Sequence, residues 1–401
     1  MTAQLGLLGR KLGHSHSPEI HKALAGYDYG LFPVEPEQLE TFLRETSCRG
    51  LNVTIPYKKA VIGFCAAFSD SARRLGSVNT MVRRPDGWYG DNTDYAGFTA
   101  LIAPFAPAGK RALVLGSGGA GTMAAQALKD LGAAAEIVSR SGSVNYENMD
   151  RTAELIVNAT PVGMWPENGK SPLDLSEFPA CEVVVDLIYN PLRTQLLLDA
   201  ERLGISCADG LWMLVVQARR AAELFTGTPI PDEKAEQVYR NLRAGMENLV
   251  LIGMPGCGKS AVGKALADAM GRPFFDADAI VTERFGDIPA IFARQGEAAF
   301  REMETQVLSE LGKQTGCVIA TGGGCVTVPE NWYHLRQNGR LIWLRRPIEA
   351  LPTAGRPLSQ ARSPQAIFAE REPLYRAWAE ITIDNTGTVT DTVREILEAI
   401  R

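Results

Sequence analysis

Residues 248–260 read NLVLIGMPGCGKS and are followed by a helical pattern from Val262 to Met270. The first five residues predict an apolar strand, and the stretch after them fits the consensus Gly-x-x-x-x-Gly-Lys-Ser of a phosphate-binding loop. In such a loop the backbone amides cradle phosphate oxygens, the lysine (Lys259) reaches the β- and γ-phosphates, and the serine (Ser260) ligates Mg²⁺. The sequence therefore predicts an α/β domain that binds ATP. The residues expected at the nucleotide are Gly256, Cys257, Gly258, Lys259, Ser260 and Ala261.

A second glycine-rich turn lies at residues 111–121, which read RALVLGSGGAG and lead into an alanine-rich helical pattern ending near Leu131. Strand, turn and helix around Gly-x-Gly-x-x-Gly are typical of dinucleotide binding, because the bare backbone approaches a pyrophosphate at the helix N-terminus. The next strand ends about 20 residues on at Arg140, where an NAD enzyme would place an acidic residue. A basic residue there predicts NADP.

The organisation around these two loops predicts three α/β domains. Strand-like runs at 136–139, 155–159 and 182–187 extend the dinucleotide fold into a doubly wound parallel sheet. Ahead of it, Pro85-Asp-Gly87 predicts a hairpin in a separate substrate domain. After it, a charged helix opens at Pro231 and is expected to end at Gly245, three residues before the new strand at Asn248. We expect a substrate domain over 1–100, closed by helices at about 210–244, a Rossmann-type NADP domain over 101–209, and a P-loop nucleotide-binding domain over 246–401.

Composition excludes several classes of protein. A chain of 401 residues exceeds one hydrophobic core, and 45% hydrophobic with 22% charged residues is ordinary for a globular protein. The net charge of −5 gives no basic field for nucleic acid, and no apolar run is long enough to span a membrane. Seven scattered cysteines without a Cys-x-x-Cys pair argue against disulfides and a thiolate metal site. We expect a cytoplasmic protein.

Polar clusters interrupt the apolar runs of the first 100 residues. Hydroxyl and amide side chains of this kind suit a polyhydroxy acid, and a lysine paired with a carboxylate would supply the proton that a ketone reduction needs. The clusters are Ser15-His-Ser17-Pro18, Asn52-Val-Thr54-Ile-Pro-Tyr-Lys58, Val78-Asn79-Thr80 and Gly90-Asp91-Asn92-Thr93-Asp94.

The region after Met246 holds 14 arginines but only 3 lysines, a bias that favours bidentate recognition of carboxylate and phosphate. Asp276 and Asp278 follow a short strand, and on an extended chain both would point to one face; one could support Mg²⁺ and the other meet an acceptor hydroxyl. The remaining polar stretches are Phe300-Arg301-Glu302-Met-Glu304, Thr321-Gly-Gly-Gly324, Gly355-Arg356-Pro-Leu358 and Arg371-Glu-Pro-Leu-Tyr375.

With its Ser-x-Ser-Pro, Asn-Val-Thr-x-Pro-x-Lys, Asn-Thr and Asp-Asn-Thr-Asp motifs in order, the chain resembles shikimate dehydrogenase over residues 1–243. Asn158-Ala-Thr, Asp186-Leu-Ile-Tyr189 and Ala208-Asp-Gly210 also match. The resemblance implies that Lys58 and Asp94 form the acid–base pair. It further implies that shikimate is bound by Ser15, Ser17, Thr54, Lys58, Asn79, Asp94, Tyr189 and Gln217.

The same resemblance implies an NADP site made of Gly116, Ser117, Gly118, Gly119, Ala120, Gly121, Ser139, Arg140 and Gly210. No second arginine follows Arg140 closely, so the clamp on the 2′-phosphate is expected to be weaker than in many relatives, with some use of NAD. The family also includes members that prefer quinate.

Residues 247–401 resemble shikimate kinase through Asp-x-Asp, Phe-Arg-x-x-Glu, Gly-Gly-Gly, Arg-Pro-Leu and Arg-x-Pro-Leu-Tyr. The resemblance implies Lys259 and Asp278 in catalysis and Ser260 with Asp276 at Mg²⁺. It places Arg356 on a lid over ATP, although the segment before Arg356 is short and lacks a further arginine. The residues implied at shikimate are Asp278, Arg301, Gly323 and Arg371.

Together the two resemblances predict a bifunctional enzyme of aromatic amino acid biosynthesis, in which 3-dehydroshikimate is reduced with NADPH and the resulting shikimate is phosphorylated with Mg·ATP. Two alternatives stay open: a quinate dehydrogenase joined to another small-metabolite kinase, and a sensor in which one half is inactive.

Overall fold

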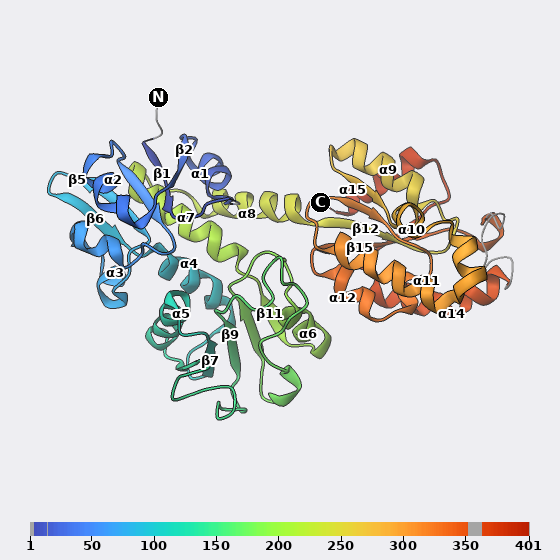
Figure 1. The fold of residues 1–401 in the computed structure, drawn as a ribbon, viewed down its shortest axis with the longest axis horizontal. Helices are drawn as coiled ribbons and strands as arrows, with labels where there is room; N and C mark the ends of the chain where they lie inside the picture. Colours follow the sequence, from blue (N-terminus) through green and yellow to red (C-terminus); the bar gives the residue numbers. More distant parts are fainter. Residues whose placement is uncertain (1–3, 14, 352–362, 401) are drawn as a thin grey trace. The chain divides into compact units, whose positions relative to one another are not determined.

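The computed structural model describes residues 4–13, 15–351 and 363–400, and the chain forms two compact units (Figure 1). The first unit comprises Met1–Val162, Ser171–Tyr189 and Asp199–Arg243. The second comprises Gly163–Lys170, Asn190–Leu198 and Ala244–Arg401. The domain limits expected from the sequence stay a prediction.

The first unit begins with a six-stranded mixed sheet in the order β2-β1-β3-β5-β6-β4. Its strands are β1 (Leu5–Gly9), β2 (Tyr29–Pro33), β3 (Gly50–Val53), β4 (Cys65–Phe68), β5 (Thr80–Arg84) and β6 (Gly87–Asp91), with helices α1 (Ser17–Ala25), α2 (Leu39–Glu45) and α3 (Asp70–Leu75). Strands β5 and β6 pair antiparallel with Arg84 opposite Gly87. The expected hairpin is therefore present, with Pro85 and Asp86 in its turn.

The second sheet of this unit is parallel, in the order β11-β10-β9-β7-β8. Its strands are β7 (Arg111–Leu115), β8 (Ala134–Val138), β9 (Leu155–Asn158), β10 (Val183–Asp186) and β11 (Ser206–Ala208). The helices between residues 93 and 246 are α4 (Thr93–Ile102), α5 (Gly119–Asp130), α6 (Gln195–Leu203), α7 (Leu211–Thr226) and α8 (Asp232–Met246). The predicted doubly wound sheet is confirmed.

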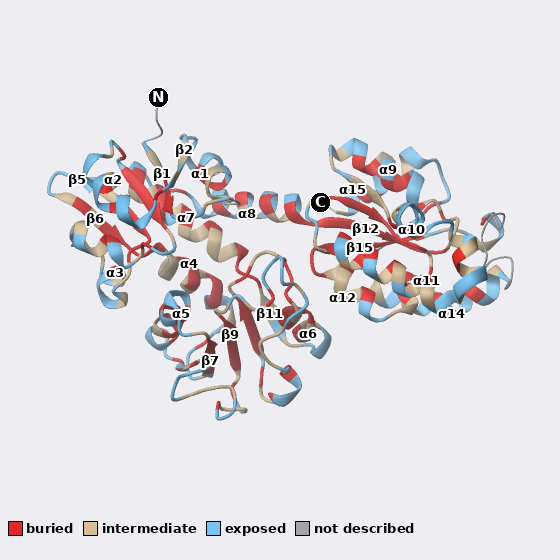
Figure 2. Cartoon of the chain, in the orientation of Figure 1, coloured by how far each residue is buried: buried red, intermediate tan, exposed pale blue. Residues whose placement is uncertain are grey.

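The interior of this parallel sheet is apolar on both faces. Every residue of β9 and β10 is buried, and Figure 2 shows β9 in red between helices that expose one side. Leu128 on α5 packs in the same core as Val157 and Val185. The polar residues of these strands, Asn158 and Asp186, are the last of each strand and hydrogen-bond to one another, so polar chemistry lies at and beyond the strand ends.

The second unit contains a parallel sheet in the order β13-β14-β12-β15-β16, with helices on both faces (Figure 1). Its strands are β12 (Asn248–Ile252), β13 (Phe274–Asp276), β14 (Val318–Ala320), β15 (Gly339–Arg345) and β16 (Ile381–Asp384). Its helices are α9 (Lys259–Met270), α10 (Ala277–Phe285), α11 (Ile288–Gly312), α12 (Glu330–Arg336), α14 (Pro364–Trp378) and α15 (Val389–Ala399). The α/β class expected from the loop at residues 253–260 is confirmed.

Short 3-10 turns connect several elements: η1 (Pro36–Gln38), η2 (Ala60–Phe64), η3 (Ala103–Phe105), η4 (Leu175–Glu177), η5 (Cys325–Thr327) and η6 (Ile348–Ala350). None of the helices in the described ranges has the length and apolar composition needed to cross a membrane.

Helix α8 ends later than the sequence predicted. Gly245 was expected to end it, yet the helix continues to Met246, and only Glu247 separates it from β12. Met246, the residue after Gly245, is buried. Burial of this side chain, about 1.5–3 kcal/mol, outweighs the cost of about 1 kcal/mol for a glycine inside a helix.

A close backbone contact in the second unit makes Gly312 sensitive to substitution. A Cβ atom on Gly312 would lie 1.9 Å from the carbonyl oxygen of His334 on α12, whereas a Cβ on Gly245 would meet nothing within 4 Å. We expect Gly312→Ala to destabilise the kinase unit by about 1–3 kcal/mol, the usual cost of overpacking. Loss of kinase activity after graded heating measures this. Gly245→Ala is the matched control and should be neutral or slightly stabilising; equal behaviour of the two variants would contradict the packing argument.

Candidate active sites

The first candidate site is a cavity of about 240 Å³ in the first unit, where residues from both of its sheets meet. Its polar lining contains every residue that the resemblance assigned to shikimate. These residues are Ser15, Ser17, Thr54, Lys58, Asn79, Asp94, Tyr189 and Gln217. Asn52, Leu187, Gly210 and Met213 also line the cavity. Sequence reasoning did not assign Asn52, although it quoted the motif that contains it.

Lys58 and Asp94 form an ion pair in this cavity, with 2.6 Å between Nζ and Oδ2. Lys58 follows strand β3, and Asp94 lies in the first turn of α4, whose N-cap Asn92 accepts a hydrogen bond from the Tyr95 amide. Both side chains are partly exposed, at 32% and 20%. An ammonium held by a carboxylate at the edge of a cavity can give a proton to a developing alkoxide and take it back.

Hydroxyl and amide groups surround this pair. Ser15 Oγ donates to Ser17 Oγ at 3.1 Å, and the Ser17 amide donates to Ser15 Oγ at 3.2 Å. Burial raises the pKa of Tyr189, so its phenol stays neutral. The cavity therefore presents mostly neutral hydrogen-bonding groups, with one ion pair among them.

The dinucleotide loop follows strand β7 as predicted. Helix α5 starts at Gly119, and a Cβ on Gly121 would lie 1.9 Å from the carbonyl oxygen of Gly116. The third glycine of the pattern is thus required for the turn to close. Ser139 and Arg140 follow strand β8, and the Ser139 amide donates to the Val144 carbonyl, so this loop is short. Arg140 is exposed, and its positive charge partly offsets the rise that burial causes in the pKa of the nearby Tyr146 phenol.

The second candidate site is a cavity of about 550 Å³ in the second unit. The loop before α9 forms one side of it, with Lys259 and Ser260 in the lining. Lys259 Nζ donates to the carbonyls of Gly253 and Met254 at 2.8 and 3.0 Å, which holds the ammonium over the loop. Cys257 is buried and lies outside the cavity lining, and its carbonyl accepts from the Asn385 amide.

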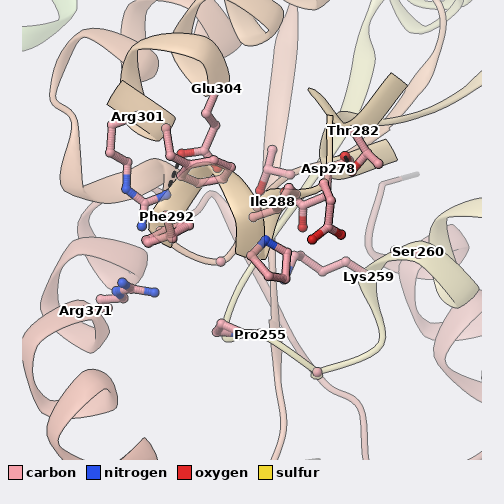
Figure 3. A pocket seen from close by; sticks show the side chains of 18 of the residues that line it. Pro255, Lys259, Ser260, Asp278, Thr282, Ile288, Phe292, Arg301, Glu304 and Arg371 are labelled. Carbon is pink, nitrogen blue, oxygen red and sulfur yellow. Dashed lines mark hydrogen bonds and ion pairs between the residues drawn. The ribbon is translucent and has the colours of Figure 1, made fainter. Parts of the chain in front are cut away.

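Two arginines form another side of this cavity. Figure 3 shows Arg301 and Arg371 on one side and Lys259 with Asp278 on the other. Arg301 donates to Glu304 at 2.6 Å, and Arg371 is only 2% exposed. Among the described residues, Arg301 Nε, Arg371 Nε and Glu304 Oε1 are buried polar atoms without a protein hydrogen-bond partner. Unsatisfied donors and acceptors at a cavity mark a place for a polar ligand.

Glu304 is a site residue that sequence reasoning did not assign. It is fully buried, and this burial raises its pKa, while Arg301 opposes the shift only in part. Its spacing of three residues from Arg301 on a helix was the available signal. Cβ atoms on Gly322 and Gly324 would overlap Glu304 and Arg301 respectively. Gly322 and Gly324 therefore have to be glycines, because the side chains of Glu304 and Arg301 lie against them.

The geometry predicted for Asp276 and Asp278 is wrong. They do not share one face of an extended chain, because α10 begins at Ala277 and Asp278 lies in its first turn. The Asp276 carboxylate caps this helix by accepting from the amides of Asp278 and Ala279. Asp278 lines the cavity, whereas Asp276 lies outside the lining. Arg356, expected on a lid, falls outside the described residues.

Two protein family models match the chain, one in each unit. Residues 7–81 match the family model of the shikimate dehydrogenase substrate binding domain, and residues 255–401 match that of shikimate kinase. The NADP-dependent shikimate dehydrogenase of Moorella thermoacetica is 36% identical over 274 residues, covering 60% of this chain and 93% of that protein. The enzyme of Shouchella clausii is 32% identical over 272 residues, covering 60% and 98%.

Solved structures give the same result for the first part of the chain. A chorismate mutase/shikimate 5-dehydrogenase fusion protein from Clostridium acetobutylicum is 36% identical with a TM-score of 0.57, covering 60% of this chain and 97% of that chain. Shikimate 5-dehydrogenase from Thermus thermophilus, solved with NADP(H) and shikimate, is 32% identical with a TM-score of 0.54, covering 60% and 99%. The chain therefore belongs to the shikimate dehydrogenase family over its N-terminal 60% and carries a C-terminal shikimate kinase domain, as a bifunctional enzyme of the shikimate pathway.

Proposed function

We propose that the cavity around Lys58 and Asp94 reduces 3-dehydroshikimate to shikimate. The observation that carries this assignment is the 2.6 Å ion pair at a cavity lined by neutral hydroxyl and amide groups. NADPH, when bound, supplies the hydride. Lys58 then gives a proton to the oxygen that was the ketone, and Asp94 holds the ammonium in place and stabilises its charged form. In the reverse reaction Lys58 accepts that proton.

The remaining lining residues orient the substrate in this proposal. Ser15, Ser17, Tyr189 and Gln217 hold the carboxylate and ring, while Thr54 and Asn79 hold hydroxyl groups beside the acid–base pair. Because these groups are neutral, they bind without adding charge that would compete with the ion pair. The same set would accept quinate, so preference for shikimate is part of the proposal.

We further propose that the turn at residues 116–121 holds the NADP pyrophosphate, with Gly210 beside the nicotinamide and Ser139 and Arg140 at the 2′-phosphate. The close fit of Gly121 on Gly116 supports the turn, because the amides at the start of α5 are left free for an anion. The exposed cation after β8 supports NADP over NAD.

In the second unit we propose transfer of a phosphoryl group from ATP to shikimate. The loop Gly256–Ala261 and Lys259 hold the phosphates, and Ser260 supplies an oxygen ligand that suits Mg²⁺, with Asp276 near the metal. Asp278 orients the attacking hydroxyl, Gly323 contacts the ring, and Arg301 and Arg371 hold its carboxylate. The unpaired buried atoms of both arginines support this last assignment.

Shikimate is the product of the first reaction and the substrate of the second. This supports a chain with two active catalytic sites over a sensor in which one half is inactive. We propose a cytoplasmic enzyme of small metabolites, with a substrate domain over 1–100 closed by helices at about 210–244, an NADP domain over 101–209 and a kinase domain over 246–401. A coupled assay from 3-dehydroshikimate with NADPH and Mg·ATP to the phosphorylated product tests the whole assignment. Either step missing from the purified chain would overturn its half.

Lys58→Ala should lower the rate of shikimate oxidation by about 10²–10⁴, the usual contribution of a positioned general acid or base. Lys59→Ala, a neighbouring exposed lysine, is the matched control and should leave the rate unchanged. Kinase activity of both variants checks that the chain is folded. Undiminished oxidation by Lys58→Ala would remove this residue from the mechanism.

Arg140→Ala should raise the KM for NADPH by roughly tenfold and leave the KM for 3-dehydroshikimate nearly unchanged, because a phosphate clamp acts through binding. Lys129→Ala removes another exposed cation of the same domain and should change neither constant. If the unmodified chain used NAD and NADP equally well, Arg140 would have no role in cofactor choice.

Arg301→Ala should raise the KM for shikimate in the kinase reaction by roughly 10–100-fold, since it removes a charged partner of the carboxylate. The KM for ATP should stay within about twofold on the same reasoning. Arg284→Ala is the control, because Arg284 is exposed and pairs with Glu310. A loss of ATP affinity instead would place Arg301 at the nucleotide.

A further inference from the structure

His21 is a buried imidazole to which neither reaction assigns a role. It lies on α1, four residues after Ser17, and is only 1% exposed. Its ring stacks on Tyr29 with 4.2 Å between centroids and a 9° angle, and Phe225 lies 5.9 Å away. This burial lowers the pKa of His21 to about 3. The imidazole is therefore neutral, with one nitrogen that donates and one that accepts.

The hydrogen bonds of His21 determine which nitrogen carries the proton. Nδ1 lies 2.5 Å from the hydroxyl of Tyr27. The imidazole also hydrogen-bonds the Asn52 side chain. We assign Nδ1 as the acceptor from Tyr27 and the other nitrogen as the donor to the Asn52 amide oxygen, because a neutral imidazole has one donor and one acceptor nitrogen.

Two donors therefore converge on Asn52 Oδ1, because the Tyr29 hydroxyl also donates to it at 2.7 Å. The amide nitrogen of Asn52 donates to Thr80 Oγ1 at 3.0 Å. With its oxygen so engaged, the amide has one orientation, and one N–H remains beyond the bond to Thr80. Asn52 is 6% exposed and lines the dehydrogenase cavity.

The same direction of donation continues from Thr80 toward the acid–base pair. Thr80 Oγ1 donates to Asn79 Oδ1 at 3.1 Å, and this oxygen also accepts from the Thr93 amide at 2.7 Å. The Asn79 amide nitrogen donates to Thr93 Oγ1 at 3.0 Å. Thr93 directly precedes Asp94. Reversing one amide would place two donors or two acceptors face to face, so the series has a single consistent polarity.

We propose that His21 is a positioning residue of the dehydrogenase, which fixes the Asn52 amide so that an N–H of that amide faces the substrate and, through Thr80, maintains the orientation of Asn79. His21 touches no substrate in this arrangement and acts through Asn52. The inference rests on the proposed function, in which this cavity binds shikimate. It gives the ligand chemistry at Asn52 as a hydrogen-bond acceptor, such as a hydroxyl or carboxylate oxygen.

The test is a double-mutant cycle in the full-length chain, using His21→Phe, Asn52→Ala and their combination. Phenylalanine keeps an aromatic ring against Tyr29 but removes both hydrogen bonds. We expect His21→Phe to raise the KM for shikimate by roughly tenfold, the effect of one misplaced hydrogen bond, with the KM for NADP unchanged within about twofold. The double variant should be no worse than Asn52→Ala alone, because His21 acts only through that amide.

Two further variants separate positioning from a merely structural role. His21→Gln can still donate to Asn52 and should restore part of the affinity. Phe225 contacts the same imidazole ring without a hydrogen bond, so Phe225→Leu should lower thermal stability and leave the KM for shikimate unchanged. If His21→Phe fails to fold, Tyr27→Phe removes only one hydroxyl and should raise the same KM by a smaller factor. Kinase activity reports on the rest of the chain.

The inference is overturned if the two single effects multiply in the double variant, if the KM values for shikimate and NADP rise together, or if neither His21→Phe nor Tyr27→Phe changes them. If Asn52→Ala is impaired and His21→Phe is not, only the positioning role fails. If the unmodified chain does not oxidise shikimate at all, the proposed function fails, and this inference with it.

Discussion

Burial of the parallel strands on both faces is the constraint on which both units depend. In β9, β10 and β12 every residue is buried, and the polar residues, Asn158, Asp186 and Asn248, lie only at strand ends. Polar groups can then lie only where strands end and helices begin, because backbone amides there are unpaired and solvent can reach them. Both glycine loops lie at such a point, the first after β7 and the second after β12. The catalytic side chains also follow strands or lie at helix starts, for the same reason.

Much of this architecture is readable in the sequence because apolar runs and glycine spacing are local signals. Strands β7 and β12 have the predicted limits, and the hairpin after Arg84 turns where Pro85-Asp86 indicates. What the sequence could not supply depends on contacts that form only after folding. Helix α8 passes Gly245 because Met246, the residue after it, is buried. Asp278 lies on α10 because Asp276 caps that helix, and neither fact follows from spacing alone.

The lining residues show the same division. Lys58 and Asp94 are 36 positions apart, so no periodic pattern connects them. The family resemblance predicts that they form a pair, and they form an ion pair in the structure. No role was assigned to Glu304 or Asn52 from the sequence, although each lies inside a motif named there. Their importance comes from burial beside a partner, which a sequence pattern does not encode. A buried carboxylate three residues from Arg301 and a buried amide between the hydroxyls of Tyr29 and Thr80 become visible only as contacts.

Under the proposed function, one small acid is recognised in two electrostatically different cavities, and the chemistry of each reaction explains the difference. Hydride transfer needs one mobile proton beside the reacting carbon, so neutral hydroxyls and amides surround a single ion pair. A further cation there would compete for Asp94. Phosphoryl transfer brings a polyanion next to a carboxylate, and repulsion between them must be offset. Arg301 and Arg371 act with Lys259 from opposite sides of the cavity, and Glu304 fixes the direction of Arg301. The charge of each lining thus follows from the charge that its second substrate brings.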